Sequence, residues 1–367
     1  MCPTRSQTSY GNSKNKSKVY FTKNITADSL TKIYEALNTS LNGKVAVKIS
    51  TGEPGGHNFL SPLLIKPLVN KLNGTIVECC TAYKGRRFEP QEHWKAIKEH
   101  GFFDIAPCDI LDESGEIEIS VTGGKHLTYN LVGANIQKYN SMLMLSHFKG
   151  HQMGGFGGAL KNMSIGLASR NGKALIHSWG NTTDLQKFWS YSHNQDAFLE
   201  SMAEACQSVV SYFKPENIVY INVANNLSID CDCNNNPAKP EMEDIGIFAS
   251  LDPVALDKCC YDQIVNSKDK GKTSLVKRME EKHARLIVVE AERLGLGSQE
   301  YEIINIDSIS ASLPHGLLVP WTAGAVVEQG IEGRGRAVSR QRGSDPARET
   351  TPAPQHAKIT LQIIQSF

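Results

Sequence analysis

Apolar residues in the first part of the chain alternate between short continuous runs and helical spacing. Val45–Ile49 and Thr75–Cys79 are runs typical of buried strands. Leu60–Leu72 and Gln91–His100 instead gather their apolar residues on one side of a helix, and Gly101 stands where a helix ends. Strands that alternate with helices are therefore predicted from residue 45 onward.

The middle of the chain predicts a β-hairpin followed by a buried strand. Glu116–Val121 alternates apolar and polar residues, Gly123 and Gly124 reverse the chain, and Leu127–Val132 alternates back. Met142–Ser146 is continuously apolar up to its final serine and delivers the chain into a glycine-rich segment. We therefore expect that segment to begin at the end of a strand.

The second half repeats the alternation of strands and helices. Apolar runs predict strands, and amphipathic spacing predicts helices, over Asp196–Phe213 (helix), Ile218–Val223 (strand), Ile245–Ala249 (strand), Val254–Val265 (helix), Lys272–Leu294 (helix) and Tyr301–Ile306 (strand). Asp252 and Pro253 form a typical helix start. The predicted fold class is α/β, with a mixed or parallel sheet flanked by helices and one β-hairpin.

Both ends of the chain differ from this pattern. Residues 1–18 are rich in Ser, Asn and Lys, and residues 308–367 contain Gly-Arg and Pro-rich stretches with little apolar periodicity. We expect both to be disordered extensions, and the second to be disordered or non-native sequence. The α/β region is then 19–307, as one unit or as two lobes at about 19–140 and 141–307.

Composition excludes several function classes. The 39 Lys and Arg residues balance 38 Asp and Glu residues, so charge offers no case for nucleic-acid binding. The absence of 18 consecutive apolar residues argues against a membrane span. Nine cysteines, with two adjacent pairs, make a poor disulfide framework and favour a reducing cytoplasm. Oligomeric state is left open.

The glycine-rich segment after Met142–Ser146 is the strongest candidate site. His147, His151 and Lys161 lie in it, and His177 follows sixteen residues later. Clustered glycines let backbone amides approach a bound group, and we expect a cofactor at Gly154, Gly155, Gly157 and Gly158. The segment matches neither the dinucleotide fingerprint nor the phosphate-loop pattern. The alternative is a solvated turn with incidental basic residues.

Three further polar segments also follow predicted strands. Asp230-Cys231-Asp232-Cys233 is either a cation site or a polar turn. Glu53 and His57 suit proton transfer or ligation, or belong to a Pro-Gly turn. Adjacent Arg86 and Arg87 either clamp a carboxylate or are solvated. Because all of these follow strands, we expect the segments to converge at one edge of the sheet.

These motifs resemble the uncharacterised family called domain of unknown function 362. The resemblance spans residues 19–307 and includes Lys48–His57, Tyr83–Arg87, His147–Asn162, Asp230–Cys233, Leu251–Asp257 and Gly295–Tyr301. Members are often labelled iron–sulfur centre proteins, and many carry an inserted ferredoxin-like module. This chain has no cysteine between His177 and Asp196. Ferredoxin-type 4Fe-4S clusters are therefore not expected.

The order His151, Lys161, His177 also resembles the core of nickel-pincer lactate racemases. That resemblance implies that Lys161 tethers or contacts a cofactor, that His177 ligates its metal, and that His151 moves a proton. The racemases use a second histidine, and the nearest equivalent in this chain is Arg86. The resemblance therefore does not extend to two-sided proton transfer or to racemisation.

Together these observations predict a metal-dependent enzyme that moves a proton or hydride on a small carboxylate. His57, His151 and Lys161 would act in catalysis, and Arg86 and Arg87 would hold the anion. A metal or metal-bearing cofactor, nickel or iron, would be bound by His147, His177, Cys231 and Cys233. The alternatives are a non-catalytic metal- or iron–sulfur-binding redox accessory protein and an inactive structural relative.

Overall fold

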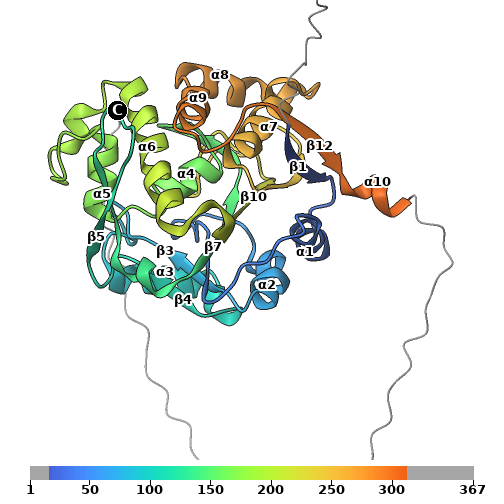
Figure 1. Cartoon of the computed structure of the whole chain (residues 1–367), viewed down its shortest axis with the longest axis horizontal. Helices are drawn as coiled ribbons and strands as arrows, with labels where there is room; N and C mark the ends of the chain where they lie inside the picture. Colours follow the sequence, from blue (N-terminus) through green and yellow to red (C-terminus); the bar gives the residue numbers. More distant parts are fainter. Residues whose placement is uncertain (1–15, 312–367) are drawn as a thin grey trace, which may run out of the picture. The chain divides into compact units, whose positions relative to one another are not determined.

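An eight-stranded mixed sheet organises residues 16–311, the part of the chain that the computed structural model describes (Figure 1). Its strand order is β12-β1-β11-β10-β7-β2-β3-β4. The strands are β1 (Ser17–Thr22), β2 (Val45–Lys48), β3 (Thr75–Glu78), β4 (Cys108–Ile110), β7 (Ser141–His147), β10 (Ile218–Ala224), β11 (Gly246–Ser250) and β12 (Tyr301–Asn305). The pairings make β11 antiparallel to both of its neighbours and every other adjacent pair parallel.

Two short hairpins lie outside the main sheet. The first joins β5 (Glu116–Ser120) to β6 (Tyr129–Gly133), as the alternating pattern predicts. The second joins β8 (Lys149–His151) to β9 (Gly155–Gly157), inside the glycine-rich segment. This second hairpin is directly relevant to the candidate site.

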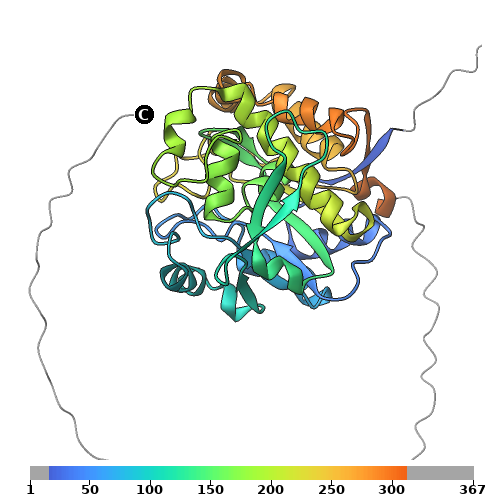
Figure 2. The same cartoon turned by 60° about the vertical axis from the view of Figure 1, so that its left-hand side comes forward.

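Helices cover both faces of the sheet (Figures 1 and 2). They are α1 (Ala27–Ala36), α2 (Pro62–Lys71), α3 (Pro90–Glu99), α4 (Ala159–Ser164), α5 (Arg170–His177), α6 (Gln195–Phe213), α7 (Pro253–Val265), α8 (Thr273–Glu281), α9 (Leu286–Arg293) and α10 (Ile306–Ala311). Helices α1, α2 and α3 pack on one face, and α4, α6, α7 and α9 pack on the other. Among residues 16–311, no helix has both the length and the apolar character needed to cross a membrane.

The strand β7 shows how the sheet divides the core. Every residue of β7 is buried. Met142 and Met144 belong to one apolar cluster, and Leu143 and Leu145 belong to the other. Since successive side chains of a strand point to opposite faces, a continuously apolar strand is what a sheet covered on both sides requires.

The α/β class, the mixed sheet and the first hairpin are as the sequence predicts. The elements β1, α1, β4, α4 and α5 were not predicted from the sequence. The predicted helix Lys272–Leu294 is two helices, α8 and α9. The chain turns between them at His283, whose φ is 50°. Apolar spacing continues across the turn through Met279 and Ile287, which are both buried, so periodicity alone did not reveal the break.

The ends of the α/β region also differ from expectation. The strand β1 begins at Ser17, inside the segment 1–18 that was expected to be disordered, and α10 extends to Ala311. The remainder of both expected extensions, residues 1–15 and 312–367, lies outside the described residues. The strand β2 pairs with β7, so segments 19–140 and 141–307 contribute to the same sheet.

Candidate active site

A cavity of about 360 Å³ lies where the segments after β2, β3, β7 and β10 meet. Its lining includes Ser50 after β2, Thr81 after β3, His147 at the end of β7 and Asp232 after β10. Because these four strands are parallel neighbours, their carboxyl ends share one edge of the sheet. The expected convergence of the strand-end segments is therefore present at this cavity.

The hairpin β8–β9 forms one wall, and close backbone packing explains two of its glycines. A Cβ at Gly150 would lie 2.4 Å from the carbonyl oxygen of Ile229. Gly155 has a φ of 78°, and a Cβ there would lie 2.4 Å from the Ala284 side chain. Gly157 and Gly158 line the cavity, whereas Gly154 and Gly155 do not. The glycines therefore serve packing as well as access.

The helix α4 presents Lys161 to the cavity, and a buried carboxylate holds the start of this helix. Asp257 of α7 accepts hydrogen bonds from the backbone N–H groups of Ala159 and Leu160, at 2.8 and 2.9 Å. It also accepts one from the Asn222 side chain at 2.7 Å. Burial raises the pKa of Asp257 to about 6.

Lys161 is the cavity lysine whose amine has no protein partner. Within residues 16–311, its Nζ forms no hydrogen bond and no ion pair. Burial, followed by the positive charges of Lys149 and Lys48, lowers the pKa of Lys161 to about 7. An amine with this pKa is partly neutral at pH 7, and the neutral amine is both a base and a nucleophile.

His151 lines the cavity with a defined proton arrangement. Its Nδ1 accepts hydrogen bonds from the backbone N–H groups of Met153 and Gly154, at 3.2 and 2.9 Å. Burial, then the positive charge of Lys161, holds the pKa of His151 well below its usual range. The ring is therefore neutral, with its proton on Nε2, and can act as a hydrogen-bond donor.

His177, at the end of α5, also lines the cavity and packs among aromatic rings. Its ring stacks on Phe198 at a centroid distance of 4.6 Å. Its Nδ1 is buried without a hydrogen-bond partner. Burial, then the charges of Lys161 and Lys173, lowers the pKa of His177 to about 3. A neutral imidazole without protein partners is the form that binds metal ions.

His147 forms a buried charge cluster with Asp232 and Lys149. Its Nδ1 lies 3.0 Å from an Asp232 carboxylate oxygen, and its Nε2 lies 2.6 Å from the carbonyl oxygen of Asn225. Both partners only accept, so both nitrogens donate, and neither is left for a metal. The Lys149 amine donates to Asp232 at 2.7 Å. Burial opposes ionisation of Asp232, but Lys149 and His147 outweigh it and hold its pKa below the usual range.

A second buried charge cluster surrounds Glu78 at the end of β3. The Lys48 amine lies 3.0 Å from one carboxylate oxygen of Glu78, and the Arg87 guanidinium lies 3.7 Å from the other. Although burial raises the pKa of Glu78, Lys48 and Arg87 lower it to about 2. Arg87 also donates to Glu53 at 2.7 Å and to the Tyr83 hydroxyl at 2.9 Å. Arg87 thus lines the cavity with much of its hydrogen-bonding capacity already used.

Two of the expected site residues lie away from the cavity. Arg86 is half-exposed and donates two hydrogen bonds of 2.7 Å to Glu99. His57 is exposed and is not among the residues that line the cavity. The segment that carries Arg86 contributes Arg87 to the cavity lining. The segment that carries His57 contributes Ser50.

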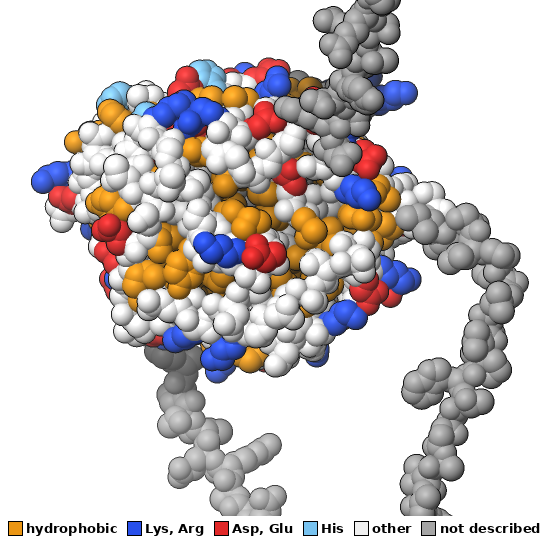
Figure 3. Space-filling model, in the orientation of Figure 1, with side chains coloured by type: hydrophobic (Ala, Val, Ile, Leu, Met, Phe, Trp, Pro, Cys, Tyr) orange, Lys and Arg blue, Asp and Glu red, His pale blue; other side chains and the backbone are white. Residues whose placement is uncertain are grey.

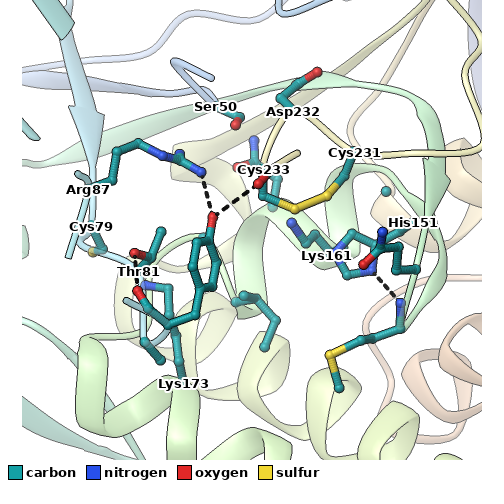
Figure 4. Close-up of a pocket in the computed structure, with 18 of the residues that line it drawn as sticks. Ser50, Cys79, Thr81, Arg87, His151, Lys161, Lys173, Cys231, Asp232 and Cys233 are labelled. Atoms are coloured by element: carbon teal, nitrogen blue, oxygen red, sulfur yellow. Dashed lines mark hydrogen bonds between the residues drawn. A yellow bond between two sulfur atoms is a disulfide. The ribbon is translucent and has the colours of Figure 1, made fainter. Parts of the chain in front are cut away.

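Cys231 and Cys233 line the cavity and are joined by a disulfide (Figure 4). A ring nitrogen of His151 and the two sulfur atoms all lie within 4.8 Å of one another. The cysteine count predicts free thiols, but these two cysteines, two residues apart, form a disulfide. The remaining cysteines of residues 16–311 are free: Cys79, Cys80, Cys108, Cys206, Cys259 and Cys260.

Several lining residues were not expected from the sequence. Lys149 stands between the two histidines of the glycine-rich segment and could have been included on that ground. Lys173 of α5 and the aromatic pair Phe188 and Trp189 also line the cavity. No motif marks these three, because their separation from Lys161 in the sequence hides their proximity.

Comparisons with known proteins give one family and two distant structures. The model of a family described as a domain of unknown function (DUF362) matches residues 45–262. No curated protein matches the chain. The lactate racemase apoprotein from Thermoanaerobacterium thermosaccharolyticum is 14% identical to it, with a TM-score of 0.36 over 65% of this chain and 54% of that one.

A protein from Thermotoga maritima is 11% identical, with a TM-score of 0.37 over 73% of this chain and 58% of that one. The similarity thus spans little more than half the length of either solved protein. Values this low carry no inference about activity.

Proposed function

The chain belongs to the DUF362 family, and from the chemistry of its cavity we propose an enzyme that moves a proton or hydride on a small carboxylate, assisted by a metal or metal-bearing cofactor. One observation carries this proposal. Lys161, His151 and His177 line the same cavity, and Lys161 has no protein partner there. An unpaired amine and two neutral imidazoles in one cavity suit proton transfer at a bound substrate.

The charge of the cavity supports an anionic substrate. Five Lys and Arg side chains line it, with two carboxylates: Lys48, Arg87, Lys149, Lys161, Lys173, Glu78 and Asp232. Glu78 pairs with Lys48 and Asp232 pairs with Lys149, so the carboxylates are already neutralised. Lys161 and Lys173 are left to attract an anion. This assignment replaces Arg86, which lies outside the cavity.

His151 is suited to polarise an oxygen of the substrate. Its Nδ1 is occupied by two backbone N–H groups, so its Nε2 proton is the one available for donation. A neutral imidazole can donate this hydrogen bond to a carbonyl or alkoxide oxygen as charge develops on it. Lys161, partly neutral near pH 7, would take up a proton from the adjacent carbon or attach a cofactor through its amine.

The residues present fit a metal-bearing cofactor. His177 has a buried Nδ1 with no partner, and its ring is neutral. We assign metal binding to His177 and the cofactor contact to Lys161. His147 is not assigned as a metal ligand, because both of its ring nitrogens form hydrogen bonds. When bound, the metal would supply an electrophilic centre.

Exchange of a carbon-bound proton tests the proposal directly. Protein purified without oxygen is incubated in D₂O with a panel of 2-hydroxy acids and with their uncharged amides. We expect loss of the α-proton signal in the NMR spectrum for at least one acid and for none of the amides. Lys161→Ala should abolish the exchange, whereas Lys84→Ala, an exposed lysine outside the cavity, should retain it.

Metal content provides the second measurement. His177→Ala should lose the metal found in the parent protein, and Lys84→Ala should retain it. Intact mass of the parent and of Lys161→Ala would reveal an adduct on the amine. Metal-free, unmodified protein that exchanges no proton from any acid would refute the proposal.

A further inference from the structure

The disulfide between Cys231 and Cys233 is a reactive group of the cavity that the proposed reaction does not use. It lies in the segment between β10 and β11, and both cysteines line the cavity (Figure 4). Cys231 is buried, whereas Cys233 is partly exposed. Cys233 is therefore the more accessible of the two residues.

This disulfide contributes little as a structural cross-link. It joins residues two apart, and such a short loop restricts the unfolded chain far less than a long-range bridge does. Hydrogen bonds already hold the segment. The backbone N–H of Glu53 donates to the Asp232 carbonyl at 2.7 Å, and the N–H of Ala238 donates to the Asp230 side chain at 2.9 Å. A role in chemistry fits the position better than a role in folding.

The charges around the two cysteines do not oppose a thiolate once the disulfide opens. Acidic neighbours disfavour thiolates, and Asp230 and Asp232 flank the cysteines. However, Asp232 is paired with Lys149 at 2.7 Å, and Asp230 lies 4.0 Å from Arg278. Lys161 also lines the cavity without a partner. The local charge that a sulfur anion would meet is therefore neutral to positive.

The position of the proton on His151 determines whether the two cysteines and this histidine could bind a metal. Its ring nitrogen and the two sulfurs lie within 4.8 Å of one another, which would suit a metal site after reduction. However, Nδ1 is held by two backbone N–H groups, so Nε2 carries the proton. A protonated nitrogen donates to a thiolate but offers no lone pair to a metal. The geometry therefore favours thiol–disulfide exchange.

We propose that Cys231 and Cys233 form a redox-active disulfide that exchanges with small anionic thiols. The thiolate attacks Sγ of Cys233, the Cys231–Cys233 bond breaks, and its electron pair leaves on Sγ of Cys231. A second thiolate then attacks the mixed disulfide and releases Cys233. Two thiols are oxidised to their disulfide, and the two cysteines take up the two protons. The small disulfide, as oxidant, drives the reverse reaction.

The size and charge of the cavity define the substrate class. A space of about 360 Å³ admits a small molecule and excludes a folded protein thiol. Lys161 and Lys173 attract the anionic group of a thiol that also carries a carboxylate. A cationic thiol of similar size should be disfavoured.

The test compares 3-mercaptopropionate with cysteamine at equal thiolate concentration. The reaction is stopped with iodoacetamide, and the peptide that contains both cysteines is quantified by mass spectrometry. We expect the anionic thiol to reduce the disulfide about tenfold faster or more. Lys161→Met should diminish the preference, and Lys84→Met should leave it unchanged. Equal rates for the two thiols in the parent protein would overturn the proposal.

Two further variants locate the attacked sulfur. Cys231→Ser and Cys233→Ser are each treated with 3,3′-dithiodipropionate, and the mixed disulfide is followed by intact mass. Capture should be faster for Cys231→Ser, which retains the partly exposed Cys233. Zinc that binds reduced protein through both cysteines and His151, and blocks exchange, would instead establish a metal site and refute the proposal. These measurements follow sulfur and need no turnover of a carboxylate, so they succeed or fail independently of the proposed enzyme activity.

Discussion

Three histidines of the cavity cannot be told apart by residue type, but the structure gives their ring nitrogens three different hydrogen-bonding environments. Both nitrogens of His147 face acceptors, the Asp232 carboxylate and a backbone carbonyl. Nδ1 of His151 faces two backbone donors. His177 has aromatic rings around it and no hydrogen bond to Nδ1. Their environments therefore suit three different roles: an ion cluster for His147, hydrogen-bond donation for His151 and, as proposed above, metal binding for His177.

The lowered pKa of Lys161 predicts an unusual pH dependence of its reactivity. Acetylation of Lys161 by limited acetic anhydride should level off above about pH 8, because its amine is half deprotonated near pH 7. The exposed Lys84 should become steadily more reactive towards pH 10. Peptide-resolved mass spectrometry measures both rates in one sample, and parallel pH profiles for the two lysines would contradict the prediction.

The free energy of unfolding should also depend on the titration of Lys161. Between about pH 7 and 10.5 the unfolded chain binds a proton at Lys161 that the folded chain does not, so the free energy of unfolding rises with pH in this window. Lys161→Met should therefore stabilise the fold most below pH 7, and this gain should shrink towards pH 10.5.

At the scale of elements, the glycine-rich segment is a hairpin followed by a helix. The strands β8 and β9 pair through residues 149–151 and 155–157, and α4 begins at Ala159. Glycine is required where the hairpin meets Ile229 and Ala284, and it leaves open space at Gly157. The same residue type therefore has different functions at neighbouring positions.

Two matched substitutions test this distinction. Gly150→Ala should lower the free energy of unfolding by about 1–3 kcal/mol, because its methyl group would meet the backbone of Ile229. Gly157→Ala has no atom within 4 Å of its new methyl group, so its stability should change by less than about 0.5 kcal/mol. Urea denaturation measures both. A larger loss for Gly157→Ala than for Gly150→Ala would contradict the packing described here.

At the scale of the whole molecule, charge is distributed differently inside the cavity and outside it. Acidic and basic side chains are interspersed on the face shown in Figure 3. The chain as a whole has a net charge near +1. The cavity, in contrast, gathers five basic side chains and two acidic ones. The protein is thus nearly neutral as a whole, while basic side chains outnumber acidic ones in the cavity.

The layered arrangement predicts where the fold is most resistant to opening. The strands β7 and β10 lie in the middle of the sheet and are buried throughout. The edge strand β12 pairs only with β1, and its residues are partly or fully exposed. Hydrogen exchange followed by mass spectrometry should therefore be slowest in β7 and β10 and faster in β12. Equal protection of β12 and β7 would contradict this order.

The amino-acid sequence by itself determined the α/β class, most strand and helix positions, and the segments that carry the cavity. Apolar periodicity is a local property, so it identifies Met142–Ser146 as a buried strand without any tertiary information. It missed the turn between α8 and α9, because both helices direct apolar residues to the same core.

Only the tertiary structure decided which side chains enter the cavity and in what protonation state. Arg86 and Arg87 are adjacent in the sequence, yet one is held outside by Glu99 and the other lies inside beside Glu78. Lys161 owes its lowered pKa to burial and to Lys149 and Lys48, which come from other elements. Proton affinity depends on distances through space, and those distances are set only when the strands have paired and the helices have packed.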